Sequence, residues 1–260
     1  MSASTAPPSE APPTAAAYVY GVAARGTVSA IAHDGVAGAA VTVVEHGDLV
    51  ALVSPVPRRP LRARRRDLVN HLRVLEHAFE QATIVPCAFG TVLPSASAVR
   101  RDLLDARSEE LHGLLRRLDG LAQLNVRAHY DEALLLREIV AADPALAALS
   151  ARTRALGDAG YYDRIRLGEL VAAAVAARRE RDAGALHARL ARFAADVVLE
   201  EPGEAGVLKA SFLVARRSLD DFDRELLAVA GEHGRRMRLE SIGPLPPTAF
   251  ARLEDGRWGF

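Results

Sequence analysis

The 260-residue sequence contains one cysteine, one lysine and few aromatic residues, and its formal net charge is zero. A single thiol, Cys87, cannot form an internal disulfide, which predicts a reducing, cytoplasmic setting. The balance of 33 basic and 33 acidic residues argues against a nucleic-acid partner, because such binding relies on excess Lys and Arg. The longest apolar run, "LVAAAVAA" at 170–177, is far shorter than the roughly 20 residues that span a bilayer. We therefore expect no membrane partner.

Patterns typical of catalytic, metal or phosphate sites are also missing. The eight histidines form no His-x3-His pair and no cluster with cysteine, so a zinc site is not expected. The segment "GTVSAIAHDGVAG" at 26–38 has neither the GxxxxGK[ST] nor the GxGxxG spacing of a phosphate loop. Cys87 lies in an apolar stretch with no base beside it, which predicts a buried structural thiol. The sequence predicts no catalytic residue, no cofactor and no metal, hence a protein that is not an enzyme.

Hydrophobic periodicity predicts strands and helices mixed through both halves of the chain. The expected strands lie at 17–23, 83–93, 124–132, 207–215 and 236–243, with a hairpin at 41–56 that turns at 46–48. The expected helices follow Asp67, span 99–118, continue from 132 with a break at Pro144, and include two separate helices around 167–175 and 186–197 and one after Ser218. Because strands and helices do not alternate strictly, the pattern is typical of an α+β protein.

Two helices have specific expected features. Leu68, Leu72, Leu75 and Phe79 recur at helical spacing and predict the buried face of the helix that Asp67 caps. The segment "SLDD" at 218–221 resembles a capping box. The Arg-rich segment "RRPLRARRR" at 58–66 is interpreted as an exposed loop, with RNA, an acidic lipid surface or an acidic protein as alternative contacts.

The sequence predicts two domains joined at Asp119-Gly120. Residues 1–17 are rich in Pro, Ala and Ser and have no signal-peptide pattern, so we expect a disordered tail. An N-terminal α+β domain is expected at 18–120. A C-terminal α+β domain with long helices and a Pro-rich tail is expected at 121–260.

The segment "TIVPCAFGTVL" at 83–93 combines β-branched residues with Pro86, Phe89 and Gly90. Pro86 indicates a sheet edge or bulge, and Gly90 a turn or a close approach of two backbones. Phe89 is expected in the core. The segment is interpreted as architecture, with a partner-binding edge strand as the alternative.

Three segments occur in an order and spacing that resemble a known family. They are "NHLRVLEHAFEQATIVPCAFGTVLPSASAVRRDL" at 70–103, "GVLKASFLVARRSLDDFDRELLAV" at 206–229 and "ESIGPLPPTAF" at 240–250, preceded by "YVYGVA" at 18–23. Together they resemble the GvpL/GvpF family of gas vesicle proteins over about 18–253. The residues that match the family's motifs, as structural positions, are Pro86, Phe89, Gly90, Phe212, Gly243, Pro244, Pro246, Pro247 and Phe250. Leu245, Thr248 and Ala249 depart from the Trp, Tyr and Ser that are usual in that closing motif.

The resemblance implies a non-enzymatic accessory protein of gas vesicle formation, located in the cytoplasm and at the gas vesicle. It implies binding to the small hydrophobic shell protein GvpA, help in nucleating or assembling the vesicle wall, and contact with other accessory Gvp proteins. It also implies two α+β domains, the C-terminal one similar to a modified ferredoxin-like fold with a helical insertion.

Two other classes of function remain open at this stage. Ferredoxin-like domains often host effectors, so a small-molecule-binding regulatory module is one alternative. A hydrolase or transferase is the other, and it would require Asp, His and Ser residues that are distant in sequence to cluster in the fold.

Overall fold

A computed structural model describes residues 15–29, 31, 33–57, 64–203 and 206–251. The chain forms two compact units, unit 1 (Met1–Leu121 with Leu245–Phe260) and unit 2 (Ala122–Pro244). The division at Leu121 falls beside the predicted boundary at Asp119-Gly120. Most of the tail predicted at 1–17 and of the loop predicted at 58–66 lies outside the described residues, and the first strand begins at Ala15 rather than near Tyr18.

Unit 1 is built on a sheet with strand order β2-β3-β1-β4, in which the short β5 also pairs with β1. Its described elements are β1 (Ala15–Ala24), the 3-10 turn η1 (Val36–Gly38), β2 (Thr42–His46), β3 (Leu49–Pro57), α1 (Arg65–Gln81), β4 (Ile84–Pro86), β5 (Val92–Leu93), α2 (Ala96–Ala98), the π-helical η2 (Val99–Asp105) and α3 (Ser108–Leu118). Strand β1 pairs antiparallel with β3, β4 and β5. The predicted hairpin at 41–56 forms as β2 and β3, and Gly47 at its turn has φ +59°.

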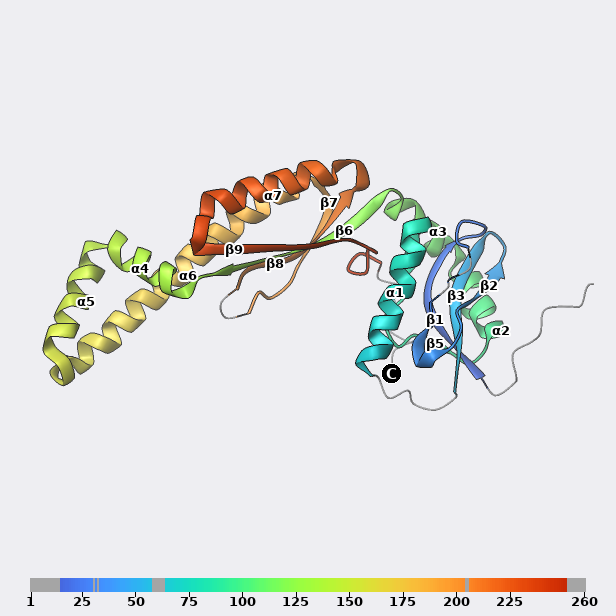
Figure 1. The fold of residues 1–260 in the computed structure, drawn as a ribbon, viewed down its shortest axis with the longest axis horizontal. Helices are drawn as coiled ribbons and strands as arrows, with labels where there is room; N and C mark the ends of the chain where they lie inside the picture. Colours follow the sequence, from blue (N-terminus) through green and yellow to red (C-terminus); the bar gives the residue numbers. More distant parts are fainter. Residues whose placement is uncertain (1–14, 30, 32, 58–63, 204–205, 252–260) are drawn as a thin grey trace, which may run out of the picture. The chain divides into compact units, whose positions relative to one another are not determined.

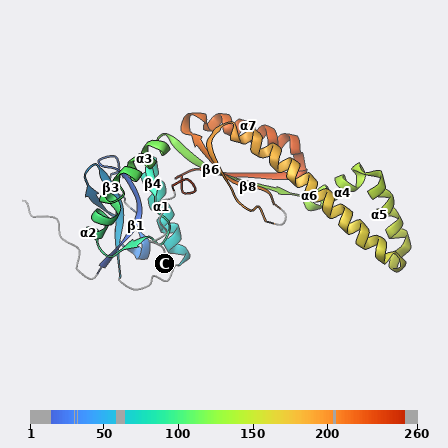
Figure 2. The ribbon, with the colours of Figure 1, turned by 180° about the vertical axis from the view of Figure 1, so that it is seen from behind.

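Helices cover both faces of this sheet, so its central strands are buried throughout. Residues Ala16–Ala23 of β1 are all buried. Helix α1 lies on one side of the sheet and α3 on the other (Figures 1 and 2). A strand covered on both faces shows a continuous apolar run rather than alternation, which explains the composition of "AAAYVYGVA".

Two predictions in unit 1 were wrong in detail. The single strand expected at 83–93 is two short strands, β4 and β5, because the chain turns between them at Gly90, where φ is +96°. The single helix expected at 99–118 is divided into η2 and α3. A π-helical stretch adds a residue to the turn and shifts the apolar stripe.

The buried face of α1 also differs from the predicted one. Leu75 and Phe79 are buried, but Leu68 and Leu72 are exposed, and Asp67 and His71 take their place in the interior. The helix begins at Arg65, and Asp67 sits in its first turn, where its carboxylate accepts a hydrogen bond from the backbone N–H of Arg64. Two buried polar side chains therefore set the orientation of α1, and apolar spacing alone did not reveal this.

Unit 2 has a four-stranded sheet with the order β7-β8-β6-β9. Its elements are β6 (Leu121–Tyr130), α4 (Glu132–Ala142), α5 (Pro144–Leu156), η3 (Gly157–Gly160), α6 (Tyr161–Ala191), β7 (Ala194–Leu199), β8 (Gly206–Ala215), η4 (Arg216–Ser218), α7 (Leu219–His233), η5 (Gly234–Arg236) and β9 (Met237–Leu245). This β-α-β-β-α-β order is the split arrangement of ferredoxin-like folds, and α4 and α5 form a helical insertion after the first strand (Figure 1). The expected α+β class and modified ferredoxin-like fold are confirmed.

Helices α6 and α7 cover one face of this sheet. The core includes Phe212 of β8 and Phe222 of α7, whose ring centroids lie 5.3 Å apart. Leu186 and Leu190 of α6 and Val126 of β6 are buried in the same cluster. At alternate positions of β8, Leu208, Ala210, Phe212 and Val214 also lie in this core.

The helices predicted around 167–175 and 186–197 are instead one helix and a strand. Helix α6 runs without a break from Tyr161 to Ala191, and Val197 belongs to β7. The exposed Gly168 and Gly184 do not interrupt the helix, because its packing against α5 and the sheet holds it. Helix α7 begins at Leu219 as expected, but the Ser218 side chain makes no capping hydrogen bond.

The C-terminal segment differs from the predicted domain division. The residues from Leu245 to Ala251 were expected to belong to the C-terminal domain, but their contacts assign them to unit 1. The backbone carbonyl of Phe250 accepts a hydrogen bond from the Arg117 guanidinium. Pro246, Pro247, Phe250 and Ala251 are buried.

Candidate functional site

The segment Pro86–Gly90 lies where β4 ends and the chain turns toward β5. Pro86 is buried and pairs with Gly21 of β1, and the N–H of Cys87 donates to the carbonyl of Tyr20 at 2.8 Å. Phe89 is half-buried, with its ring against Tyr18 and His71 at centroid distances of 6.2 and 5.5 Å. Pro86 thus ends a short strand, and Phe89 packs over an aromatic cluster.

A buried tyrosine and histidine fix this turn. The N–H of Gly90 donates to the Tyr18 hydroxyl at 3.0 Å, and that hydroxyl lies 2.9 Å from Nδ1 of His71. Burial lowers the pKa of His71 to about 4, against the opposing effect of a hydrogen bond to the Cys87 backbone. His71 is therefore neutral at pH 7, and its unprotonated Nδ1 accepts a hydrogen bond from the Tyr18 hydroxyl.

A second tyrosine, Tyr20, binds the loop that contains η1. Its hydroxyl donates to Ser54 Oγ at 2.9 Å and accepts from the N–H of Val36 at 2.7 Å. Ser54 Oγ in turn donates to the carbonyl of Ala40. The Asp67 carboxylate accepts from the N–H of Ala37 at 3.1 Å, so three buried side chains hold this loop.

The Asp, His and Ser residues of this cluster do not form a catalytic triad. Ser54 bonds to Tyr20 and to a carbonyl, His71 bonds to Tyr18, and Asp67 accepts from backbone N–H groups. A nucleophile requires a base within hydrogen-bonding reach. The geometry supports a structural role for the cluster.

The Cys87 thiol is also unsuited to act as a nucleophile. It is buried, and desolvation raises its pKa to about 12, with Arg107 opposing the shift. A reactive cysteine requires a lowered pKa. The side chain acts as a small apolar group.

The remaining family-motif residues divide between the two units. Phe212 is fully buried in unit 2, and Pro246, Pro247 and Phe250 are buried in unit 1. Gly243 has φ +152°, and a Cβ there would lie 2.6 Å from Leu124 Cδ2 and 2.7 Å from the Gln123 carbonyl oxygen. Only glycine fits this close approach of two strands, and Pro244 follows it through a cis peptide. The family-motif residues thus belong to both units.

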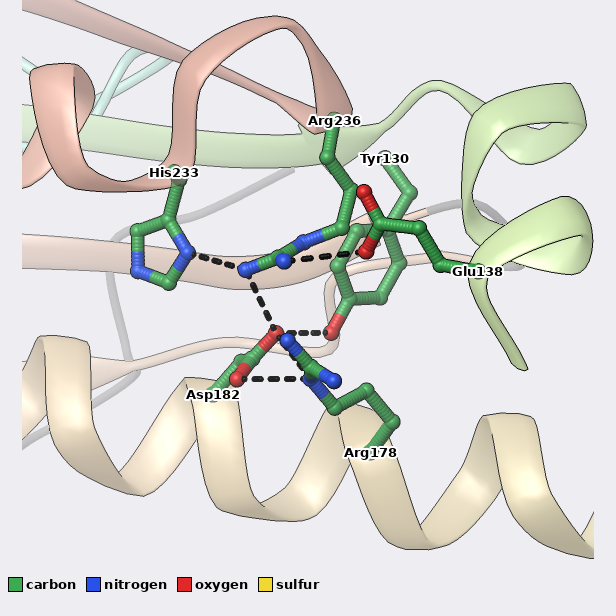
Figure 3. Close-up of polar contacts among 6 residues, drawn as sticks. All are labelled: Tyr130, Glu138, Arg178, Asp182, His233 and Arg236. Atoms are coloured by element: carbon green, nitrogen blue, oxygen red, sulfur yellow. Dashed lines mark hydrogen bonds and ion pairs between the residues drawn. The ribbon is translucent and has the colours of Figure 1, made fainter. Parts of the chain in front are cut away.

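The structure shows a polar cluster in unit 2 that the sequence analysis missed (Figure 3). The Asp182 carboxylate accepts from the Tyr130 hydroxyl at 2.8 Å and from Arg178 Nε at 3.1 and 3.2 Å. Arg236 Nη1 donates to Glu138 at 3.0 Å, and its Nη2 donates to Nδ1 of His233 at 2.6 Å and lies 3.8 Å from Asp182. The only sequence signal was the i,i+4 spacing of Arg178 and Asp182.

This cluster joins the helical insertion to the sheet. Tyr130 is the last residue of β6, Glu138 belongs to α4 and Asp182 belongs to α6 (Figure 3). His233 is the last residue of α7, and Arg236 is the last residue of η5, which follows it. Burial, and then the hydrogen bond to Asp182, raises the pKa of Tyr130, and burial lowers the pKa of His233. A neutral His233 accepts a hydrogen bond from the Arg236 guanidinium through Nδ1. The cluster is thus a set of paired polar groups typical of a structural junction.

The sheets also present edge strands to solvent, which is a different kind of candidate site. In unit 2 the edges are β7 and β9. Strand β9 carries Arg238, Glu240 and Pro244, which are the residue types that blunt an edge against pairing. Strand β7 has the sequence AADVVL with the single charge Asp196, and the Leu199 side chain is 58% exposed. We call residues Ala194–Leu199 the β7 edge.

Hydrogen bonding leaves part of the β7 edge without a strand partner. β7 pairs antiparallel with β8, and the N–H of Glu200 donates to the Lys209 carbonyl at 2.9 Å. Because inward and outward groups alternate along an antiparallel pair, Leu199 directs its N–H and C=O away from β8. The N–H of Val197, which also points outward, is bonded to the Asp196 carboxylate at 2.8 Å. No residue in the described part of the chain pairs with the outward groups of Leu199, so the apolar end of the edge at Leu199 is open to an added strand.

Within the described ranges, no three His, Cys, Asp or Glu residues are grouped so that they could hold a metal ion. No helix in those ranges is long and apolar enough to cross a membrane.

Comparisons with known proteins show which family and which relatives this chain resembles. The family model described as "Gas vesicle synthesis protein GvpL/GvpF" matches residues 16–252. The chain is 37% identical over 238 residues to gas vesicle protein F of Streptomyces sp. (strain CB03234), covering 90% of this chain and 98% of that protein. It is 30% identical over 261 residues to gas vesicle protein L of the same strain, covering 92% and 93%.

The fold matches a solved structure over nearly its whole length. The crystal structure of the gas vesicle protein GvpF from Anabaena sp. PCC7120 superposes with a TM-score of 0.75 at 21% identity, covering 93% of this chain and 98% of that one. The fold and site together define a two-unit α+β protein whose polar clusters are structural and whose second unit is ferredoxin-like. The chain belongs to the gas vesicle synthesis protein GvpL/GvpF family, as the sequence resemblance predicted.

Proposed function

We propose that this protein binds the hydrophobic shell protein GvpA and assists nucleation and assembly of the gas vesicle wall, without acting as an enzyme. Membership of the GvpL/GvpF family supports a role in gas vesicle formation. The open, apolar β7 edge is the observation that carries the binding proposal. The proposal places the protein in the cytoplasm and at the vesicle, with other accessory Gvp proteins as further partners.

The mechanism follows from the physical problem of building a hydrophobic wall. A shell subunit must bury apolar surface and pair its strand edges only in the growing wall, since unpaired edges and exposed apolar segments aggregate. Addition of a shell strand to an existing sheet satisfies its backbone groups, while side-chain contacts give specificity. The β7 edge offers outward backbone groups at Leu199 beside an exposed apolar side chain. It thus provides a first pairing surface for a subunit awaiting incorporation.

A co-expression experiment tests this proposal. The protein and the GvpA of the same genome are expressed together, and capture of GvpA is compared between wild type and Leu199→Pro. Proline removes the outward N–H donor and leaves the inward hydrogen bonds to β8 in place. We expect wild type to capture GvpA and Leu199→Pro to capture at least about tenfold less, because strand addition depends on main-chain hydrogen bonds.

The matched control is Leu199→Thr, which keeps the N–H donor and introduces a β-branched side chain that suits a strand. We expect Leu199→Thr to retain most of the capture. If proline substitutions in every edge strand leave capture unchanged, the edge mechanism is wrong. If wild type captures no GvpA and vesicles still form after deletion of the gene, the proposed function is itself wrong.

A further inference from the structure

Helix α6 presents a long face whose residues stay exposed among the described elements of unit 2. Its buried side carries Asp182, Leu186 and Leu190, while Tyr162, Ile165 and Leu170 on the other side are exposed. The Tyr162 side chain is 83% exposed. Figure 2 shows α6 in front of the strands, with α4 and α5 beside its first half. Exposed large apolar side chains that gather on one helix can mark a surface for a partner.

The outer face has a regular stripe along most of its length. Exposed residues recur every three or four positions, as they do along one side of a helix. We call these residues the α6 stripe: Tyr162, Arg166, Glu169, Ala173, Ala176, Glu180 and Gly184. Large side chains occupy its first half, and the second half is small except for Glu180. A Cβ added at Gly184 would meet nothing within 4 Å, so packing within the chain does not require glycine there.

The stripe is complementary to itself when reversed about Ala173. Arg166 and Glu180 lie at equal separations from Ala173, on opposite sides, and so do Tyr162 and Gly184. Two antiparallel copies of α6 that cross at Ala173 would place each Arg166 opposite a Glu180 and each Tyr162 opposite a Gly184. Parallel copies would instead oppose arginine to arginine and glutamate to glutamate. Charge and side-chain size therefore both select the antiparallel arrangement.

Among the described residues, neither charge of this pairing is held in a hydrogen bond or close ion pair, although Arg166 lies near enough to Asp163 to help lower the pKa of that carboxyl. Asp163, the acidic neighbour of Arg166, is bound by two hydrogen bonds from Arg152 at 2.7 and 2.9 Å. Residues three and four positions from Glu180 toward the C-terminus are Ala183 and Gly184, which offer no cation.

We propose that the α6 stripe is a docking surface for a second copy of this chain, which binds as an antiparallel helix pair. The stripe spans roughly 33 Å at 1.5 Å per residue. A single helix pair of this length lies near or below the lower end of specific interfaces, about 1,200 Å² in total. The dimer is therefore weak and reversible, and it forms at high local concentration, such as several copies gathered on one assembling vesicle.

Sedimentation velocity of the full chain over a concentration series tests the proposal. Wild type is expected to shift reversibly from monomer to dimer. Arg166→Glu and Glu180→Arg each place like charges opposite one another at two symmetry-related positions, so each is expected to raise the dimer Kd by about tenfold or more. The double variant Arg166→Glu with Glu180→Arg restores opposite charges, and its Kd is expected to return to near the wild-type value.

The charge swap distinguishes this surface from any other mode of association. Arg154→Glu makes the same charge change on α5, away from the stripe, and is expected to leave the Kd unchanged. Far-UV circular dichroism checks that each variant is folded. A wild type that stays monomeric to its solubility limit overturns the proposal, as does a dimer that the single variants do not weaken or that the double variant does not restore.

Discussion

At the scale of single residues, the Tyr18 hydroxyl organises the turn in the family's Pro-x-x-Phe-Gly element. It accepts from the Gly90 N–H and bonds to His71 Nδ1, and both groups are buried. Tyr18→Phe leaves these two groups without a partner. The expected cost is about 1–3 kcal/mol, the range for an unsatisfied buried polar group.

Peptide-level hydrogen exchange in urea measures the effect of Tyr18→Phe on unit 1. The matched control is Tyr162→Phe, which removes a hydroxyl at an exposed position and should change stability by less than about 0.5 kcal/mol. Equal stability of the Tyr18 variant and the control would show that the turn does not depend on this hydroxyl.

His71 predicts a pH dependence with a definite sign. Its pKa is about 4 in the folded chain, below the unfolded value of roughly 6.5, because burial disfavours the charged form. The unfolded chain therefore binds the proton more readily. The stability that neutral His71 contributes is complete above pH 6.5, declines as the pH falls toward 4, and amounts to about 3 kcal/mol.

NMR titration of the His71 ring measures this pKa directly. The folded protein is expected to keep His71 neutral down to about pH 4, while the same ring in urea titrates near 6.5. A folded-state titration near 6.5 would contradict the burial argument. His71→Gln should reduce the loss of unit 1 stability between pH 6.5 and 4.

At the scale of elements, most strands and helices follow from local pattern, because their apolar spacing agrees with their final packing. The β2–β3 hairpin and the break at Pro144 are clear cases. The boundary between α6 and β7 could not be predicted from apolar spacing. Leu186, Leu190, Phe193 and Val197 keep helical spacing across it, yet the helix ends at Ala191 and Val197 pairs with Phe212 of β8. Strand pairing, a non-local interaction, decides that boundary.

The unit 2 polar cluster and the α1 face were unpredictable for a related reason. Asp182 and Tyr130 are far apart in sequence, and so are His71 and Tyr18. A buried polar side chain is tolerated only when its partner is close in the fold, and sequence spacing does not report that. The prediction that Leu68 and Leu72 lie on the buried face of α1 was wrong, because the polar side chains of Asp67 and His71 are buried there instead.

Asp182→Asn tests the cluster that joins the insertion to the sheet. The amide keeps the size of the side chain but removes the charge that pairs with Arg178 and lies near Arg236. Breaking a buried pair in this way is expected to cost about 3–5 kcal/mol. Hydrogen exchange should become faster in α4 and in the middle of α6.

The control for Asp182→Asn is Asp163→Asn, which breaks the more exposed pair with Arg152. Exposed ion pairs contribute little to stability because water and salt screen them, so this variant should have little effect. Similar costs for the two substitutions would show that the cluster is no more important than a surface ion pair.

At the scale of the whole molecule, the chain leaves unit 1 after Leu121 and returns to it at Leu245. Phe250 is buried in unit 1, although its sequence position suggested the second domain. Phe250→Ala is expected to destabilise unit 1 by about 3–5 kcal/mol through loss of packing. Hydrogen exchange in β1 and α3 should accelerate, with unit 2 protected as before.

Ile242→Ala, at an exposed position of β9, is the control for Phe250→Ala and should leave exchange in unit 1 unchanged. If Phe250→Ala alters unit 2 and not unit 1, the assignment of the C-terminal segment is wrong. The sequence could not reveal this return, because local pattern shows where a segment is apolar and not which core it enters.

Both the family and the fold class could be predicted from the sequence. The order of the motifs indicated the family, and the hydrophobic pattern indicated the fold class. The β7 edge was not, because β7 itself was taken for helix. The proposed role in wall assembly depends on that edge.

The most direct measurement is capture of GvpA by wild type, Leu199→Pro and Leu199→Thr in parallel co-expressions. The account predicts capture by wild type and Leu199→Thr and a loss of at least about tenfold with Leu199→Pro, since only proline removes the outward N–H donor. Equal capture by all three proteins would contradict strand addition at β7. No capture by any of them would contradict GvpA binding.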